Sequence, residues 1–424
     1  MRARYLNLYG IMNSRFVKNR IKQIEKRMSI CYDVRIHFVG CVWENNEPKE
    51  RQKAMNRKIW KALGIAVCML ALAAPRAMAE THWVRSDADF KKAVEEINKS
   101  GDEENEIILD DEVITLEGDT TEYTLRRGRT TIKGEGHKIS IKSRAEIKVE
   151  GGETVLNLGV NGYDKKLTID GDTTAAFIVV SGGATANMYE NVTLQNRMFT
   201  GNACVLITGS NSVFNMDGGV IEECSRAVIA QSRATFNMSR GEIRNCVSTN
   251  DGVGLYADNS TITINNGTIS GCKARMGAGG GLYAKNQSTI TIKGGTISGC
   301  EAGAGGGLYV DGSAVTISGG TISECTAAIK EGGGLYATNS SEITISGGTI
   351  SRCKAPSADK GNGSGLYANH STIKITDGTI SGCEGRWGGG LYAENSSTIE
   401  ITGGTISRCK VGAGGGLFVT DSTL

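Results

Sequence analysis

A short alternation of apolar and polar residues recurs through the second half of the chain. A typical unit, residues 279–300, reads Gly-Gly-Gly-Leu-Tyr-Ala-Lys-Asn-Gln-Ser-Thr-Ile-Thr-Ile-Lys-Gly-Gly-Thr-Ile-Ser-Gly-Cys. Because successive side chains of a strand point to opposite faces, Leu282 and Ile290 are predicted to point inward and Tyr283 outward. Each unit is therefore predicted to contain three short strands, which Gly or Asn turns separate.

Two residue types mark the repeat. Cysteine recurs at intervals of 22 to 30 residues, and each aromatic marker before Phe418 lies 16 or 17 residues before a cysteine. The distance from a cysteine to the next aromatic residue varies from 9 to 14. Insertions thus enter at one edge, just before the Gly-rich strand, which we call the insertion edge. The cysteine row is Cys224, Cys246, Cys272, Cys300, Cys325, Cys353, Cys383 and Cys409, and the aromatic column is Tyr256, Tyr283, Tyr309, Tyr336, Tyr367, Tyr392 and Phe418.

Three strands in about 26 residues leave no room for crossover helices. The unit instead fits one turn of a parallel β-helix, with like strands stacked about 4.8 Å apart. No unit buries its own apolar face alone, so several coils are needed. We predict an all-β solenoid of about eleven coils over residues 131–424, with regular coils from about residue 215.

Residues 80–130 are predicted to cap this solenoid at its N-terminal end. Ser86 is a candidate N-cap, apolar residues follow at helical spacing, and Gly101 is a candidate stop. We expect one short amphipathic helix over residues 87–100.

The start of the chain carries a targeting pattern. Residues 55–79 read as a secretory signal peptide, with a basic stretch, an apolar run and a small-residue cleavage site after Ala79. Residues 1–54 hold 12 Lys/Arg against 5 Asp/Glu and show no periodicity. We interpret them as a mis-assigned start, with Met55 as the true initiator, or as an extended leader. The chain stops at Leu424, where another strand should begin, so we expect a truncated C-terminus.

Composition and charge narrow the possible functions. The 424 residues include 58 Gly but only 3 Pro, which excludes collagen and Pro-rich linkers. A hydrophobic share of 39% excludes a polytopic membrane protein. Residues 80–424 hold 31 Lys/Arg and 40 Asp/Glu, a net charge of −9, and this excludes nucleic acid as the expected partner.

The cysteine row has three interpretations. Its members are buried, inert thiols that line one turn, or they form disulfides between successive coils in an oxidising compartment. Stacked Cβ atoms lie farther apart than a disulfide usually allows, so pairing would need local distortion. A metal site needs four sulfurs that converge on one centre, which a linear row does not provide. We expect no metal and no cofactor.

The insertion edge is the candidate binding surface. Trp387 lies in an insertion that has no counterpart in other units, and basic residues occupy neighbouring insertions. A basic edge with an aromatic residue suggests a contact surface, although solvated turn residues would show the same pattern. The aromatic column is either a stacking platform for sugars or a partner, or a cross-strand stack that stabilises the sheet. The candidate binding residues are Arg275, Lys330, Lys354, Lys360, Arg386 and Trp387.

The motifs resemble a known group of surface proteins. Ile-x-x-Cys with Gly-Gly-x-Leu-Tyr resembles the Phe-x-x-Asn and Gly-Gly-Ala-Ile repeats of the polymorphic outer-membrane proteins. More broadly, residues 130–424 resemble right-handed β-helix proteins of the pectin-lyase-like superfamily. The resemblance implies right-handed coils and an exported adhesin-like or passenger domain. Cys replaces Asn and Ile replaces Phe here, and we expect membrane contact only through a missing or separate anchor.

Three functions fit these features. The first is a non-catalytic binding module, extracellular, at the cell surface or in the periplasm, that contacts a host or neighbouring-cell protein or glycan. The second is a polysaccharide-acting lyase or hydrolase, which would need clustered carboxylates. Glu222 followed by Arg244 one coil later reads as an ion pair rather than a catalytic pair. The third is a structural stalk.

Overall fold

The computed structural model describes residues 79–424, except residues 101–102, 198–201, 358–360 and 413. Every described residue belongs to one compact unit, residues 75–424. The predicted leader and the signal peptide up to residue 78 therefore lie outside the described residues, as does Lys360.

Sheet A is the largest sheet and contains 21 strands among the described residues. In several coils the second and third strands of the predicted unit join into one bent strand of ten residues. The strands are β1 Glu80–Val84, β2 Glu104–Leu109, β3 Val113–Gly118, β5 Arg129–Lys133, β6 Lys138–Ser143, β8 Val155–Leu158, β9 Leu167–Thr173, β11 Thr185–Met188, β12 Val192–Gln195, β14 Val213–Glu222, β16 Thr235–Arg244, β19 Thr261–Ile264, β20 Thr268–Ser270, β23 Thr289–Ile292, β24 Thr296–Ser298, β27 Ala314–Ile317, β28 Thr321–Ser323, β31 Glu342–Ser351, β33 Thr372–Ser381, β35 Thr398–Ile401 and β36 Thr405–Ser407.

Two further sheets complete each coil. Sheet B has 12 strands and carries the Leu-Tyr-Ala segments, and sheet C has four strands at the insertion edge. Sheet B consists of β4 Thr124–Leu125, β7 Ile147–Glu150, β10 Ile178–Ser181, β13 Val205–Thr208, β15 Val228–Gln231, β18 Leu255–Asp258, β22 Leu282–Lys285, β26 Leu308–Asp311, β30 Leu335–Thr338, β32 Leu366–Asn369, β34 Leu391–Glu394 and β37 Leu417–Val419. Sheet C consists of β17 Val247–Ser248, β21 Lys273–Ala278, β25 Glu301–Ala304 and β29 Thr326–Ala327.

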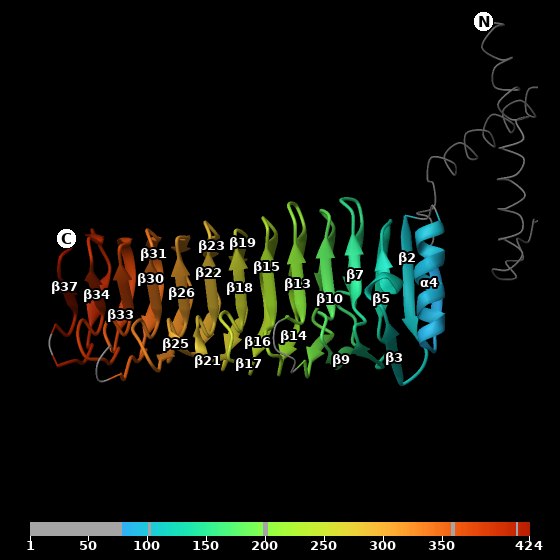
Figure 1. Cartoon of the computed structure of the whole chain (residues 1–424), viewed down its shortest axis with the longest axis horizontal. Coiled ribbons are helices and arrows are strands. Elements are labelled where there is room, and N and C mark those ends of the chain that lie inside the picture. Colours follow the sequence, from blue (N-terminus) through green and yellow to red (C-terminus); the bar gives the residue numbers. More distant parts are fainter. Residues whose placement is uncertain (1–78, 101–102, 198–201, 358–360, 413) are drawn as a thin grey trace, which may run out of the picture. The chain divides into compact units, whose positions relative to one another are not determined.

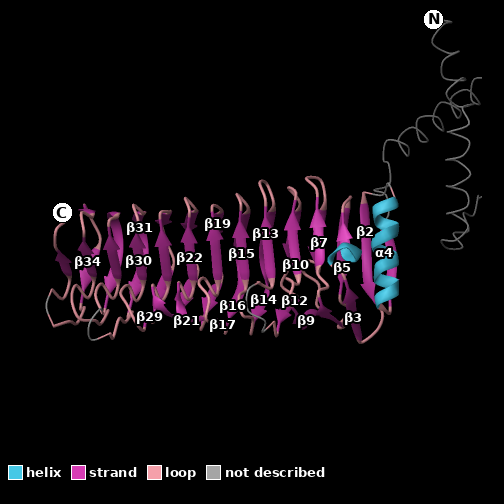
Figure 2. Cartoon of the chain, viewed as in Figure 1, coloured by secondary structure: helices cyan, strands magenta, loops and turns pink. Residues whose placement is uncertain are grey.

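The strands pair in parallel with their counterparts in neighbouring coils, and like residues stack on like. Leu282 of β22 pairs with Leu308 of β26, and Ile292 of β23 pairs with Ile317 of β27. The result is a right-handed parallel β-helix of about 13 turns, which confirms the predicted fold class. Figure 2 shows the stacked strands with loops gathered along the edges of the stack.

The predicted number of about eleven coils is too low, because the stack begins earlier than residue 131. Strand β1 pairs with β2, and β2 pairs with β5, so the parallel ladder starts at Glu80. The first coils carry neither the cysteine nor the Gly-Leu-Tyr marker, and their strands were therefore assigned to the cap. One end of the stack is covered by helix α4, Asp87–Lys99, which ends one residue before the predicted boundary (Figure 1).

Helix α4 forms as its sequence indicates. The Ser86 hydroxyl accepts a hydrogen bond from the Asp89 backbone N–H at 3.2 Å and so caps the first turn. Phe90 and Ile97, both fully buried, pack on the apolar core of the first coils. A short 3-10 helix, η1 Thr120–Tyr123, follows, and the Tyr123 ring meets Phe90 edge to face at 6.0 Å.

The inward positions agree with the alternation in the sequence. Leu282 and Ile290 are fully buried, and Ile297 is 2% exposed. Inward residues of all coils join one continuous apolar core from the helix to the last strands. Each coil thus buries its apolar face only against its neighbours, as a solenoid requires.

Candidate functional site

Sheet C lines the insertion edge and carries charges of alternating sign. Lys273 of β21 lies 3.4 Å from Glu301 of β25. Lys354 lies 3.9 Å from Glu384 of the next coil, and backbone bridges join Lys354 to Glu384 and Glu384 to Lys410. Lys354, a candidate binding residue, is therefore part of an exposed ion pair along the edge.

Three apolar side chains are exposed on the same edge, and each is next to a cation in the sequence. Met276 is 77% exposed and follows Arg275, and Ile329 is 50% exposed and precedes Lys330. In the part of the chain that the structure describes, neither Arg275 nor Lys330 has an ion-pair partner. The third pair is Arg386 and Trp387, whose indole is 36% exposed. We call these three the basic–apolar pairs.

A hollow of about 230 Å³ lies between the first two pairs. Met276 and Ile329 stand on opposite sides, and the coil between them contributes only Gly303 and Ala304. The ring of Tyr309 also lines the hollow, as do Asp251 and Lys330. Small residues in the middle coil leave the space that a larger side chain would fill.

Backbone hydrogen bonds fix the walls of this hollow. The N–H groups of Ile329 and Lys330 both donate to the Gly303 carbonyl, at 3.1 and 2.7 Å. On the other side, the Ala278 N–H donates to the Asp251 carboxylate at 2.7 Å. The walls are therefore held in place by the chain itself, so a ligand would not have to order them.

Trp387 lies farther along the edge, in a less open environment. Its ring meets Phe418 of the last coil at 5.6 Å, and the Arg386 guanidinium lies 6.0 Å from its centroid. A hollow of about 410 Å³ borders this loop and includes Pro356, Gly385 and Arg386 in its lining. Part of the indole remains available for contact, whereas one aromatic neighbour already covers another part.

The aromatic column is a continuous stack. Neighbouring rings from Tyr256 to Phe418 have centroids 4.7 to 5.5 Å apart, and most pairs are nearly parallel. Because the face of each ring covers the face of the next, only the ring edges of the column are open to solvent. Tyr367 is only 2% exposed. Burial raises the pKa of Tyr309 to about 12. This arrangement is that of a cross-strand stack, and it leaves little face for a sugar ring.

The outward column is longer than its tyrosines indicate. In register with Tyr256, the earlier coils place Ile229, Leu206 and Val179 at the same outward position of sheet B. The Arg226 guanidinium lies over the Tyr256 ring at 4.9 Å and separates the aromatic from the aliphatic part. The alternation of inward and outward residues in these strands could have revealed that the outward column continues into the earlier coils. The Gly-Leu-Tyr marker alone does not reveal it.

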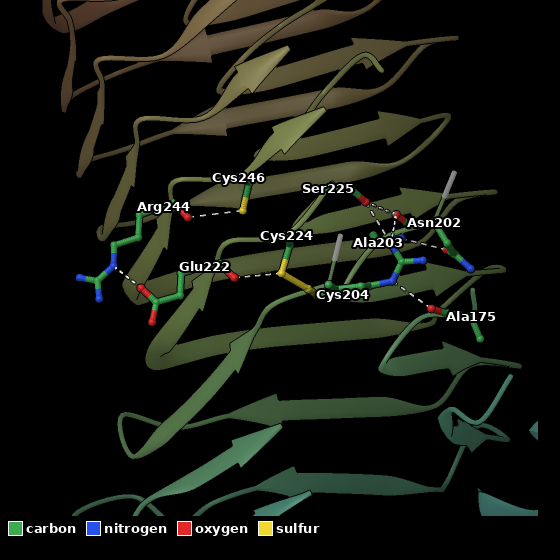
Figure 3. The surroundings of a disulfide bond; sticks show 10 residues. Ala175, Asn202, Ala203, Cys204, Glu222, Cys224, Ser225, Arg244 and Cys246 are labelled. Atoms are coloured by element: carbon green, nitrogen blue, oxygen red, sulfur yellow. Dashed lines mark hydrogen bonds and ion pairs between the residues drawn. A yellow bond between two sulfur atoms is a disulfide. The ribbon is translucent and has the colours of Figure 1, made fainter. Parts of the chain in front are cut away.

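Cys224 differs from the other cysteines of the row, because it forms a disulfide with Cys204 (Figure 3). The prediction that Cys224 joins a row of like cysteines is therefore wrong at this position. Cys204 lies directly before β13 and outside the repeat interval, so the cysteine spacing does not indicate this pairing. The buried Arg197 adjoins this region and donates to the Ala175 and Asn202 carbonyls at 2.9 and 2.7 Å.

The remaining seven cysteines, Cys246 to Cys409, are free thiols, and all but Cys409 are buried. Each thiol donates to the carbonyl two residues earlier, as Cys246 does to Arg244 at 3.5 Å. The side-chain interaction with Cys353 and burial raise the pKa of Cys383 to about 12. The row stacks inside the turn that follows the third strand of each coil.

Other sequence candidates have structural partners. Glu222 and Arg244 form an ion pair at 2.8 Å across neighbouring coils. Over the described residues, no group of three or more His, Cys, Asp or Glu side chains is placed to hold a metal ion. The described helices include none that is long and apolar enough to cross a membrane.

Comparison with known proteins supports the fold. A family model described as "right handed beta helix region" matches residues 280–423. No curated protein and no solved structure gives a significant match. The match supports a β-helix repeat protein, and the geometry of its insertion edge provides the functional argument.

Proposed function

We propose that this protein is an exported, adhesin-like binding module that contacts a protein or glycan of a host or neighbouring cell through its insertion edge. The observation that carries the proposal is the set of basic–apolar pairs, which expose Met276, Ile329 and Trp387 on one side of a rigid stack. Exposed apolar side chains beside exposed cations are typical of a contact surface.

Export is supported by two features. The basic and apolar pattern of residues 55–79 is that of a secretory signal peptide. The disulfide between Cys204 and Cys224 is of a kind that persists mainly in oxidising compartments. N-terminal sequencing of the mature protein should give Glu80 as the first residue, and a mature chain that retains residues before Met55 would contradict the leader interpretation.

The binding role is tested by attachment of the labelled mature chain to candidate host or neighbouring cells. We expect Arg386→Ala with Trp387→Ala to reduce attachment at least fivefold, because an interfacial aromatic and its cation are lost. The matched control is Lys293→Ala with Val113→Ala, which removes an exposed cation and an exposed apolar side chain elsewhere. Equal attachment of both variants would indicate a stalk rather than an edge-binding module.

Catalysis is the alternative that the same preparation can test. Incubation with polyuronides should release neither unsaturated uronides nor reducing sugar if the protein only binds. Release of either product, proportional to protein concentration, would favour a lyase or hydrolase and would contradict the proposal.

A further inference from the structure

We propose that the insertion edge binds an acidic amphipathic α-helix of a partner protein, whose apolar side chains seat beside Met276, Ile329 and Trp387. This inference rests on the proposed function and adds the chemistry of the partner. It follows from the spacing of the basic–apolar pairs, from the hollow between two of them and from their charge.

The three pairs occur at alternate coils. One complete coil, with Gly303, separates Met276 from Ile329, and another, with Ala355, separates Ile329 from Trp387. Since like strands of neighbouring coils stack about 4.8 Å apart, Met276 and Ile329 lie about 10 Å apart along the edge, and Trp387, which pairs with Asn362, follows two coils later. An α-helix rises about 10.5 Å in seven residues, so side chains at i, i+7 and i+14 match this spacing.

The hollow between Met276 and Ile329 provides a socket for one apolar side chain of that helix. Gly303, Ala304 and Tyr309 line it, and its volume of about 230 Å³ suits a single aliphatic side chain. Met276 can adapt its unbranched side chain to the ligand, whereas Ile329 is stiff. A helix that lays one apolar stripe into such sockets is a recurrent mode of recognition.

Charge determines the polar flanks of the partner. Arg275 and Lys330 are exposed beside the apolar residues, whereas Lys273 and Lys354 are already paired with glutamates. The Asp251 carboxylate in the hollow accepts a hydrogen bond from the Ala278 N–H. The cations available to a ligand therefore favour glutamate or aspartate three or four residues from each apolar side chain of the helix.

The test measures the binding of labelled synthetic peptides to the chain from Glu80 onward by fluorescence anisotropy. The probe is an alanine-based helix of about 21 residues with leucine at every seventh position and glutamates that flank each leucine. Met276→Ser with Ile329→Ser should weaken binding at least tenfold, and Arg275→Glu with Lys330→Glu should weaken it to a similar degree. Rising salt should weaken binding to the unmodified protein.

Three controls make the result specific. Lys293→Glu changes an exposed charge in the turn between β23 and β24 and should alter affinity less than twofold. A probe with lysine in place of glutamate should bind at least tenfold more weakly. Circular dichroism checks that the Met276→Ser, Ile329→Ser variant folds. If it does not fold, the same apolar contact is removed by replacing the central leucine of the probe peptide with serine.

Several results would overturn the inference. These are equal affinity for the glutamate and lysine probes, binding that neither edge variant weakens, or tighter binding of an acidic polyproline peptide of the same charge. If the helical probe does not bind but the edge variants still lose cell attachment, the proposed binding module stands and the helical partner is rejected. If the edge variants also keep full attachment, both proposals are wrong.

Discussion

Gly307 shows how closely successive coils approach one another. A Cβ atom at this position would lie 2.5 Å from the Gly334 carbonyl oxygen and 2.9 Å from Ile322 Cγ2. Equivalent contacts occur at Gly281, Gly334, Gly365 and Gly390, directly before each Leu-Tyr pair. The Gly-Leu-Tyr marker therefore records a steric requirement of stacking.

Gly307→Ala should lower the free energy of unfolding by about 1–3 kcal/mol, because the new methyl group must push neighbouring coils apart. Urea denaturation of the chain from Glu80 onward measures the change. Gly152→Ala is the matched control, since a Cβ there meets nothing within 4 Å, and it should change stability by less than about 0.5 kcal/mol. Equal effects of the two substitutions would refute the steric explanation.

Glu146 should make stability depend on pH. Burial raises its pKa to about 6, and Lys148 only partly opposes the shift. A carboxyl group with a higher pKa in the folded chain binds its proton more tightly when folded, so its favourable contribution is complete below the unfolded pKa of about 4.5 and is lost as the pH rises past about 6.

Glu146→Gln should therefore raise the free energy of unfolding by about 1 kcal/mol at pH 8 and leave it nearly unchanged at pH 4. Denaturant titrations of both proteins at the two pH values measure the difference. A glutamine variant that is less stable than the parent at pH 8 would show that the ionised carboxylate is favourably paired.

At the scale of elements, ladders of like side chains join the coils. One such ladder lies on the outer face of sheet A and consists of Asn157, Asn187, Asn215 and Asn237. The side-chain amide of each of the last three donates a hydrogen bond to the amide oxygen of the preceding asparagine, at 2.8 to 2.9 Å. Buried serines form another, in which the Ser260, Ser288 and Ser313 backbone N–H groups each donate a hydrogen bond to a serine hydroxyl of the next coil at 3.0 to 3.3 Å. The spacing of residue types along the chain reveals the cysteine row but neither of these ladders.

Asn215→Ala should cost about 1–2 kcal/mol, because it removes one hydrogen bond to Asn187 and leaves the Asn237 amide without its acceptor. The comparison is Thr291→Ala, a half-buried position of the same outward row. Thermal unfolding of the two variants should differ clearly. A loss at Asn215 no greater than at Thr291 would mean that the ladder adds little to stability.

The free thiols should be almost unreactive in the folded chain. Six of the seven thiols are buried, so a reagent in water cannot reach their sulfur atoms, and only Cys409 among them is partly exposed. A thiol reagent at pH 8 should modify no more than one cysteine per chain from Glu80 onward, and urea should release the rest. Rapid native modification of several cysteines would show that the turns open.

For the whole molecule, the fold was predictable because the same alternation recurs in coil after coil. The earlier coils were not counted, since their inward residues vary in type and carry no marker. The pairing of Cys204 was missed because disulfide partners depend on proximity in space, and this pair joins the segment just before β13 to the turn after β14. The sheet C strands were missed because they are short and rich in Gly, Ala and charge.

The binding surface was only partly predictable. The insertions in the sequence identified Arg275, Lys330 and Arg386. The ion pair between Lys354 and Glu384 joins two coils, so the sequence of a single unit does not reveal it. Met276 and Ile329 were overlooked because an apolar residue in a loop is usually buried. Their exposure could have been predicted because both lie in insertions and each is next to a cation in the sequence.

The central claim is that the insertion edge is the contact surface, and oxidation of Met276 tests it most directly. Met276 is 77% exposed, whereas Met188, Met216 and Met238 are fully buried and serve as internal controls. Dilute peroxide should oxidise Met276 rapidly in the free chain, and mass spectrometry should show at least fivefold slower oxidation when the chain is attached to cells. Oxidation of Met276 at the same rate in the free and attached chain would contradict the account.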